Sequence, residues 1–256
     1  MRSCTQVGFL DEQQVSSSIN FRRIVVSRAV PSDVLRIAEI VVLAFENDAH
    51  TQMTIEARGR GAYQNDMAQG MQGWMASPRS IVMKATDDRD QTIVGFCAWG
   101  FDGVPIPGSE DGSTPQLDSE TSEEVAEDTQ APKNERVKRL AELETATTKH
   151  LLDFMTKVKA DCSKRIFIIS LAVDPRYQGQ GVGSSLVKWR TDVADRSGAV
   201  SWVHSSEAGW RCYEKQGFKE VDRLTVNLDD WAVESSEKQK RWGEYTWRYG
   251  VRECTG

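Results

Sequence analysis

Residues 166–186 read I-F-I-I-S-L-A-V-D-P-R-Y-Q-G-Q-G-V-G-S-S-L, and this stretch decides the fold. The run Ile166 to Val173 is short, apolar and rich in β-branched residues, and Pro175 closes it, so it predicts a strand buried on both faces. Apolar residues then recur at helical spacing up to Ser197-Gly198, where the helix is expected to end: Val182, Leu186, Trp189 and Val193.

The glycine-rich turn Gln178 to Gly183, between this strand and this helix, predicts an anion-binding site. A helix N-terminus presents free backbone N–H groups, and the helix dipole adds about +0.5 charge there. Glycine adopts positive φ and lets the backbone approach a phosphate closely. We therefore expect main-chain amides from Gly179 to Ser184 to hold a diphosphate. The alternative to an anion-binding site is an ordinary tight turn whose glycines are needed only for packing.

Three cofactor classes use such loops, and the spacing separates them. A dinucleotide fingerprint needs G-x-G-x-x-G, but the third glycine here, Gly183, comes one place early. A P-loop needs Lys after its last glycine, where this chain has Ser184-Ser185. The coenzyme A pattern Q/R-x-x-G-x-G/A is met by Gln178, Gly181 and Gly183.

The rest of the chain alternates between strand-like and helix-like segments. Strands are expected over Arg23–Val30, Ser80–Thr86, Thr92–Phe101, Ala199–His204, Lys219–Leu228 and Tyr245–Val251. Helices are expected from Ser32 or Asp33 through Phe45, over Tyr63–Met75, Glu135–Ala160 and Trp210–Gln216, with a loop or short helix over Glu46–Gly61. This order predicts one α/β domain with a mixed sheet.

Composition limits the classes of protein that are possible. The 256 residues are 39% hydrophobic and carry a net charge of −6. We expect one domain over residues 21–256, preceded by a flexible tail, 1–20, that lacks the apolar core of a signal peptide. Residues 102–134 are acidic and proline-containing, which predicts a disordered insertion.

Charge, hydropathy and cysteine spacing argue against nucleic-acid, membrane and metal binding. A sequence pI near 5.3 argues against nucleic-acid binding. No run approaches the roughly 20 apolar residues that span a bilayer, so no membrane partner is expected. The five cysteines lack C-x-x-C spacing, which argues against a disulfide framework and a metal site and favours the reducing cytoplasm.

Two linked motifs carry a family resemblance. The run Ser170 to Leu186, and Cys212 to Phe218 (C-Y-E-K-Q-G-F) at the matching distance downstream, resemble the two signatures of the GNAT superfamily of N-acetyltransferases. Weaker similarity covers Arg22 to Asp48; in all, the resemblance spans about Arg22 to Val251 and is strongest over Ile166 to Val221. The chain resembles stand-alone members common in fungi. Cys212 replaces the usual Leu of the second motif, and Ser206 stands where many members carry an Asn that touches the cofactor.

The resemblance implies an α/β fold with a mixed, mostly antiparallel sheet flanked by helices, whose central parallel strands splay apart. It also implies acetyl-CoA as the cofactor and direct attack of an amine on its thioester. The residues that match the cofactor-binding positions are Leu171, Ala172, Val173, Gln178, Gly179, Gln180, Gly181, Val182, Gly183, Ser184 and Ser206.

The same resemblance suggests the reacting groups. Tyr213 matches the tyrosine that protonates the thiolate, although a packed helical tyrosine is the alternative. The strand Ile166–Val173 has no ionisable side chain for the base, so His204, at the end of the next strand, is the best substitute, with a structural or exposed histidine as the alternative. Glu46, Asp48 and His50 follow the first helix, where the acceptor is expected to bind; they would bind the amine or relay its proton through water, and solvated loop charges are the alternative.

The sequence therefore predicts a cytoplasmic acetyl-CoA-dependent N-acetyltransferase that acts on a primary amine of a small molecule. A protein or peptide N-acetyltransferase and a non-catalytic acyl-CoA-binding module remain the alternatives. Neither the acceptor nor the choice between monomer and homodimer follows from the residues.

Overall fold

Seven strands form one sheet in the order β1-β2-β3-β4-β5-β7-β6 in the computed structural model, which describes residues 23–106, 134–233 and 240–254. Every neighbouring pair is antiparallel except β4 and β5. The strands are β1 (Ile24–Arg28), β2 (Ser80–Asp87), β3 (Ile93–Asp102), β4 (Arg165–Val173), β5 (Val200–Ser206), β6 (Lys219–Asn227) and β7 (Glu244–Arg252). The predicted mixed, mostly antiparallel sheet is confirmed.

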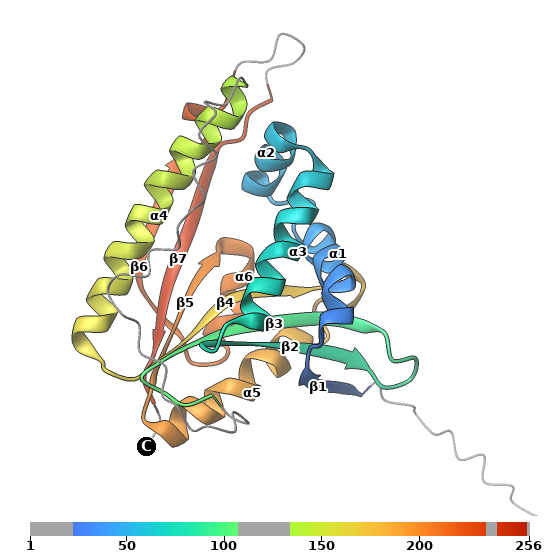
Figure 1. The fold of residues 1–256 in the computed structure, drawn as a ribbon. Helices are drawn as coiled ribbons and strands as arrows, with labels where there is room; N and C mark the ends of the chain where they lie inside the picture. The colour runs from blue at the N-terminus through green and yellow to red at the C-terminus, as the bar shows by residue number, and fades with distance from the viewer. Residues whose placement is uncertain (1–22, 107–133, 234–239, 255–256) are drawn as a thin grey trace, which may run out of the picture.

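Helices cover both faces of the sheet (Figure 1). They are α1 (Val34–Ala44), α2 (Ala49–Arg58), α3 (Arg60–Ala76), α4 (Glu135–Asp161), α5 (Val182–Ser197) and α6 (Glu207–Glu214), with short 3-10 turns η1 (Pro31–Asp33), η2 (Pro175–Tyr177) and η3 (Leu228–Asp230). Between Glu46 and Gly61, where the pattern fits a loop or a short helix, the structure has α2 and the start of α3. No helix in the described ranges is long and apolar enough to cross a membrane.

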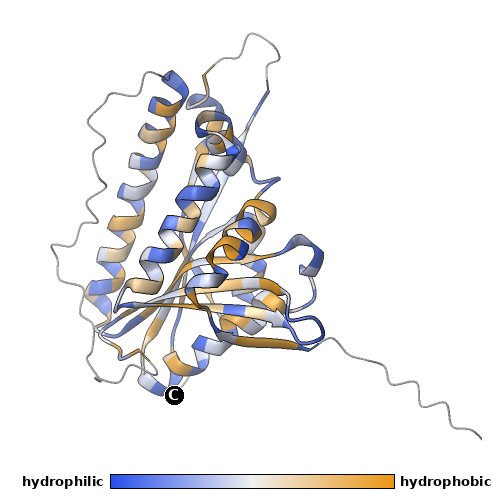
Figure 2. Ribbon diagram, turned by 45° about the vertical axis from the view of Figure 1, so that its right-hand side comes forward, coloured by the Kyte–Doolittle hydropathy of each residue, from blue (hydrophilic) through white to orange (hydrophobic). Residues whose placement is uncertain are grey.

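Apolar side chains pack in three clusters between the sheet and these helices. One cluster joins the sheet to α5 and α6, a second lies under α1 and α3, and a third lies between α4 and the β5–β7 end of the sheet. In α1, Ile37, Ile40 and Val41 are buried at the helical spacing that the sequence predicts. Hydrophobic residues accordingly dominate the central strands, whereas they alternate with hydrophilic residues along α4 (Figure 2).

The two parallel strands separate partway along their length. Residues Arg165–Ile168 of β4 pair with Val200–Val203 of β5, and no pairing between these strands is found beyond this point in the described chain. Against β3, Ile168 and Ser170 of β4 face consecutive residues, so Ile169 is an extra residue and forms a β-bulge. Because a bulge bends its strand, β4 leaves β5 here. The predicted splay is confirmed.

The predicted insertion, 102–134, has ordered ends. Asp102 is the last residue of β3, forms an ion pair with Arg165, and is followed by the buried Val104 and Ile106. Asn134 caps α4, because its side chain accepts a hydrogen bond from the Arg136 amide at 2.9 Å. Residues 102–106 and Asn134, which lie within the predicted insertion, therefore belong to the described fold. Residues 107–133, like the predicted tail 1–20, lie outside the described residues.

Candidate functional site

The glycine loop lies where β4 ends and α5 begins. Gly179 and Gly181 have φ of 72° and 85°, and Gly181 is the N-cap of α5. A Cβ added at either glycine would meet nothing within 4 Å, so positive φ, and not packing, requires glycine there. The amides of Val182, Gly183 and Ser184 belong to the first turn of α5, which has no preceding turn to accept them. The loop therefore ends in three N–H groups that no helical carbonyl accepts.

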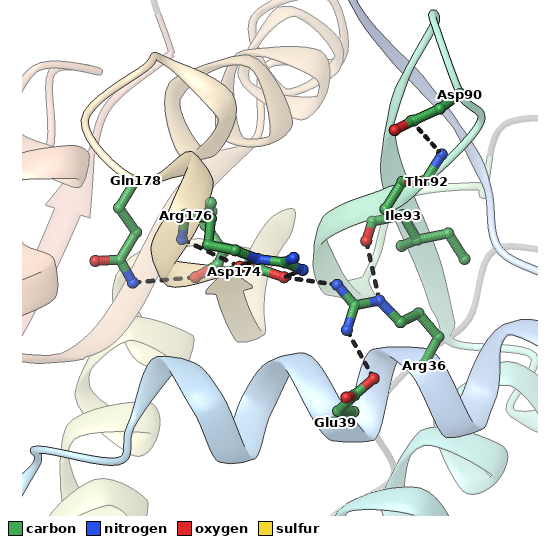
Figure 3. Close-up of polar contacts among 9 residues, drawn as sticks. Arg36, Glu39, Asp90, Thr92, Ile93, Asp174, Arg176 and Gln178 are labelled. Atoms are coloured by element: carbon green, nitrogen blue, oxygen red, sulfur yellow. Dashed lines mark hydrogen bonds and ion pairs between the residues drawn. The ribbon is translucent and has the colours of Figure 1, made fainter.

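A buried carboxylate holds the loop in place (Figure 3). Asp174, the residue after β4, is fully buried and accepts hydrogen bonds from Arg176 Nε at 3.0 Å, Arg176 Nη2 at 2.7 Å and Arg36 Nη2 at 2.6 Å. The hydrogen bonds from Arg176 and then from Arg36 hold the pKa of Asp174 well below its usual range, against the opposing effect of burial. Asp174 therefore stays ionised and fixes η2 against α1.

Two further hydrogen bonds help these contacts of Asp174, here called the Asp174 brace, to hold the loop in place. Arg36 also donates to the carbonyl of Ile93 in β3 at 3.2 Å, so α1, β3 and the loop are joined at one guanidinium. Gln178 Nε2 donates to the carbonyl of Val173 at 3.0 Å, which ties the loop to the end of β4 (Figure 3). The sequence predicts Gln178 but not Arg36, because Arg36 and Asp174 are 138 residues apart and no local pattern links them.

Helix α6 packs against the first turn of α5 and brings Tyr213 close to the loop. A Cβ added to Gly183 would lie 3.2 Å from Cys212 Sγ, so glycine allows the two helices to approach. Tyr213 is 6% exposed, and its ring contacts Phe218 edge-on with centroids 5.9 Å apart. Burial raises the pKa of Tyr213 well above its usual value, so the phenol is protonated at neutral pH.

Ser206 stands at the open end of the splay, as the last residue of β5 and the N-cap of α6. Its hydroxyl oxygen accepts a hydrogen bond from the Gly209 amide at 3.4 Å. A Cβ added to Gly209 would lie 3.5 Å from Ser206 Oγ and 3.7 Å from Tyr213 Cε2. Ser206 and Tyr213 are therefore neighbours across this glycine.

All three histidines of the chain meet beside the splay: His50 of α2, His150 of α4 and His204 of β5. The His204 ring stacks on Tyr249 with centroids 4.8 Å apart, His150 contacts the same tyrosine at 5.0 Å, and His50 contacts Trp247 at 5.3 Å. The three Nε2 atoms are buried and form no hydrogen bond with any described residue. Nowhere in the described ranges do three His, Cys, Asp or Glu side chains lie so that they could hold a metal ion.

Burial disfavours the charged forms of His204 and His50. Burial, and then the neighbouring imidazoles of His150 and His50, lower the pKa of His204 to about 4. Burial also lowers the pKa of His50, against the nearby Asp48 carboxylate. Of these histidines the sequence predicts His50 and His204. His150 comes from a helix whose place in the fold the sequence does not reveal.

The predicted acidic residues take different positions. Asp48 is the N-cap of α2, where Oδ1 accepts the Thr51 amide at 2.8 Å, and Oδ2 accepts the hydroxyl of Tyr245 at 2.7 Å. Glu46 instead pairs with Arg60 at 3.1 Å on the exposed surface. The structure therefore brings Asp48, His50 and His204 to one region and leaves Glu46 outside it. Tyr245 is missed by the sequence reasoning, although the alternating aromatic residues of β7 are a signal.

The comparisons with known proteins come from a family model and from solved structures. The model described as "Acetyltransferase (GNAT) family" matches residues 44–218. A mosquito arylalkylamine N-acetyltransferase like 5b is similar in structure, with a TM-score of 0.53 and 19% identity over 91% of this chain and all of the mosquito chain. A candidate arylalkylamine N-acetyltransferase 7 of the yellow fever mosquito gives a TM-score of 0.54 and 12% identity over 90% of this chain and 87% of its own.

No curated protein matches the chain significantly. At such low identity the solved structures support the fold alone. The family model spans 175 residues, from 44 to 218, which is more than half of the 256. It covers both the glycine loop and the motif around Tyr213. The chain therefore belongs to the GNAT acetyltransferase family.

Proposed function

We propose that the protein is a cytoplasmic acetyl-CoA-dependent N-acetyltransferase that acetylates the primary amine of a small molecule by direct attack. One observation carries this proposal: β4 parts from β5 after Ile168 and continues unpaired on that side to Val173, where it leads toward the glycine loop and the N-terminus of α5. A strand with unused pairing groups and an anion-binding loop at its end suit a cofactor with a pantetheine arm and a diphosphate.

The residues of the loop fit coenzyme A. The diphosphate would lie on the amides of Gly179, Gln180, Gly181, Val182, Gly183 and Ser184, where Gly179 and Gly181 leave open space. The pantetheine arm would pair with the backbone of Leu171, Ala172 and Val173, next to Ser206. Acetyl-CoA supplies the thioester, and the chain supplies position and proton transfer.

Two proton transfers are needed, and the described residues offer a group for each. Tyr213 is the proposed acid for the thiolate that leaves, since burial keeps its phenol protonated. His204 is the base that the sequence predicts, and it lies at the opening. Its lowered pKa makes it a weak base, so the carboxylate of Asp48 competes with it for the amine proton.

The walls of the acceptor region favour an amine with an aromatic or apolar body. Rings of His50, His204, Tyr245 and Trp247 contact one another there, and Asp48 is the carboxylate among them. A polyamine or a basic peptide would need several carboxylates.

The first test measures free thiol after incubation with acetyl-CoA and a panel of amines. We expect thiol release with arylalkylamines, and less with spermidine or a lysine-containing peptide. Faster release with the peptide would favour the protein acetyltransferase. Tight acetyl-CoA binding without thiol release for any amine would favour a non-catalytic acyl-CoA-binding module.

The second test places a negative charge in the loop. Gly181→Asp should abolish acetyl-CoA binding measured by calorimetry, because its carboxylate would repel the diphosphate. Gly198→Asp is the matched control: Gly198 caps the other end of α5, has φ of 63° and also has open space around it. The control carries a similar backbone strain without touching the loop. Equal affinities of the two variants would refute this placement of the cofactor.

A further inference from the structure

Three side chains from separate elements form a hydrogen-bonded series across the open end of the splay. Tyr245 of β7 donates its hydroxyl proton to Asp48 Oδ2 at 2.7 Å. Ser206 of β5 pairs in register with Trp247 of β7, two residues along the chain from Tyr245, and its side chain is a hydrogen-bonding neighbour of the Tyr245 hydroxyl. Ser206 ends β5 and Asp48 begins α2, so the series runs from the splay to the N-terminus of α2.

The first member of this series lies next to the group that would protonate the thiolate. Ser206 Oγ and Tyr213 Cε2 lie on either side of Gly209, at 3.5 Å and 3.7 Å from the position that a Cβ would take there. If the acetyl thioester lies by Tyr213, as the proposed function requires, the attacking amine comes within reach of Ser206. Asp48 does not need to touch the amine, because Tyr245 spans the distance.

We propose that Tyr245 is a positioning residue that passes the amine proton from Ser206 to Asp48 during acetyl transfer. The amine nitrogen forms a bond to the acetyl carbon and gives its proton to Ser206 Oγ. The Ser206 proton moves to Tyr245 Oη, and the Tyr245 proton moves to Asp48 Oδ2. The C–S bond breaks, and the thiolate takes the proton of Tyr213. This inference rests on the proposed function.

Charge decides between Asp48 and His204 as the final proton acceptor. Protonating Asp48 removes a charge from a partly buried site, whereas protonating His204 creates one beside His50 and His150. The Nε2 atom of His204 is buried without a hydrogen-bond partner in the described ranges, so nothing there stabilises its protonated form. The carboxylate is also the group that is already joined to Ser206 through Tyr245.

The test compares two tyrosines that lie close to Asp48. Tyr245→Phe removes only the hydroxyl that links Ser206 to Asp48. Tyr63→Phe is the matched control, because Tyr63 is also half-buried near Asp48 but has Thr51 as its hydrogen-bonding partner. We expect Tyr245→Phe to lower kcat about 100-fold, the usual effect of losing a general base, with KM for acetyl-CoA and for the amine within about twofold of wild type. Tyr63→Phe should keep the wild-type kcat.

A second comparison separates a proton path from a structural contact. Asp48→Asn keeps an oxygen to cap α2 but cannot take the proton, so it should lower kcat like Tyr245→Phe. Because the two residues act as one unit, the double variant should lose no more than either single variant. A kcat within about threefold of wild type for Tyr245→Phe, an equal loss in Tyr63→Phe, or a double variant whose loss is the product of the two would overturn the proposal.

The outcome is distinguishable from a failure of the proposed function. If the wild-type protein releases no thiol with any amine, the acetyltransferase assignment fails. If it releases thiol and Tyr245→Phe does so equally well, the relay alone fails. Thermal melts of each variant establish that it is folded, and Asp48→Asn carries the test if Tyr245→Phe does not fold.

Discussion

Tyr213 is a buried phenol and Tyr245 a half-buried one near the same opening, yet their surroundings suit them to different steps. The Tyr245 hydroxyl donates to the Asp48 carboxylate, and burial, followed by the Asp48 charge, raises the pKa of Tyr245. Tyr213 packs edge-on against Phe218 in an apolar region beside the loop. The first is engaged with a proton acceptor, whereas the second keeps its proton for a nearby anion.

Tyr213→Phe should therefore impair turnover without affecting cofactor binding. The change removes the hydroxyl and leaves the ring packed against Phe218. We expect kcat to fall about 100-fold, the usual contribution of a general acid, while the dissociation constant for acetyl-CoA is unchanged. Steady-state thiol release and calorimetry measure the two quantities. An unaltered kcat would return Tyr213 to a packing role.

At the level of elements, the loop depends on its connection to α1. Asp174 accepts hydrogen bonds from the backbone amide, Nε and Nη2 of Arg176, and it also accepts one from Arg36 of α1. The hairpin between β2 and β3 repeats the first part of this arrangement, because buried Asp87 accepts the same three groups of Arg89. The two carboxylates differ in that Asp174 leads directly into the glycine loop.

This repeat provides a controlled prediction. Asp174→Ala should lower the free energy of unfolding by about 3 kcal/mol, because it leaves the Arg36 guanidinium without its buried partner, and should weaken acetyl-CoA binding at least tenfold. Asp87→Ala should destabilise the fold without affecting acetyl-CoA binding. Urea unfolding and calorimetry measure both effects. Equal loss of affinity in the two variants would show that the Asp174 brace does not act on the loop.

Local elements are largely predictable from the sequence, whereas contacts between distant elements are not. The strand, glycine turn and helix of residues 166–186 carry their own signals in apolar runs and glycine spacing, so the loop is predicted correctly. Helix α2 gives a weak pattern, because the polar Thr51 and Thr54 are buried together with Met53. Tyr245 and Asp48 are 197 residues apart, so only the fold brings them together.

At the scale of the whole molecule, the three histidines join α2, α4 and the sheet. Neutral imidazoles add no charge there, whereas a protonated His50 or His204 would place charge among aromatic rings. Asp48 is the carboxylate near His50, Arg58 is a cation near it, and Asp222 lies 3.5 Å from His150 Nε2. The packing of these elements therefore depends on pH.

As the pH falls, the packing of α2 and α4 on the sheet should weaken before the contacts of Asp174 that hold the glycine loop. A lowered pKa in the folded state means that the unfolded chain binds more protons, so stability falls as the pH drops. For His204 the fall should extend from about pH 6.5, the pKa of a free histidine, to about pH 4. Urea unfolding between pH 7 and pH 4 measures it. His204→Gln should flatten this dependence, and an unchanged slope would contradict the assignment.

Asp174, whose pKa is depressed, contributes stability above about pH 4, the pKa of a free aspartate, and loses it only below that value.

The divergence of β4 from β5 has a consequence for the solution behaviour of the protein. Unpaired strand edges usually lie at the border of a sheet, where they recruit strands of other molecules and start aggregation. Here the unpaired edge lies in the interior of the sheet, with β3 paired on one side and β7 on the other. Under the proposed function, these backbone donors and acceptors would pair with a narrow, extended ligand, and their place inside the sheet leaves less room for a strand of a second polypeptide than a border edge would.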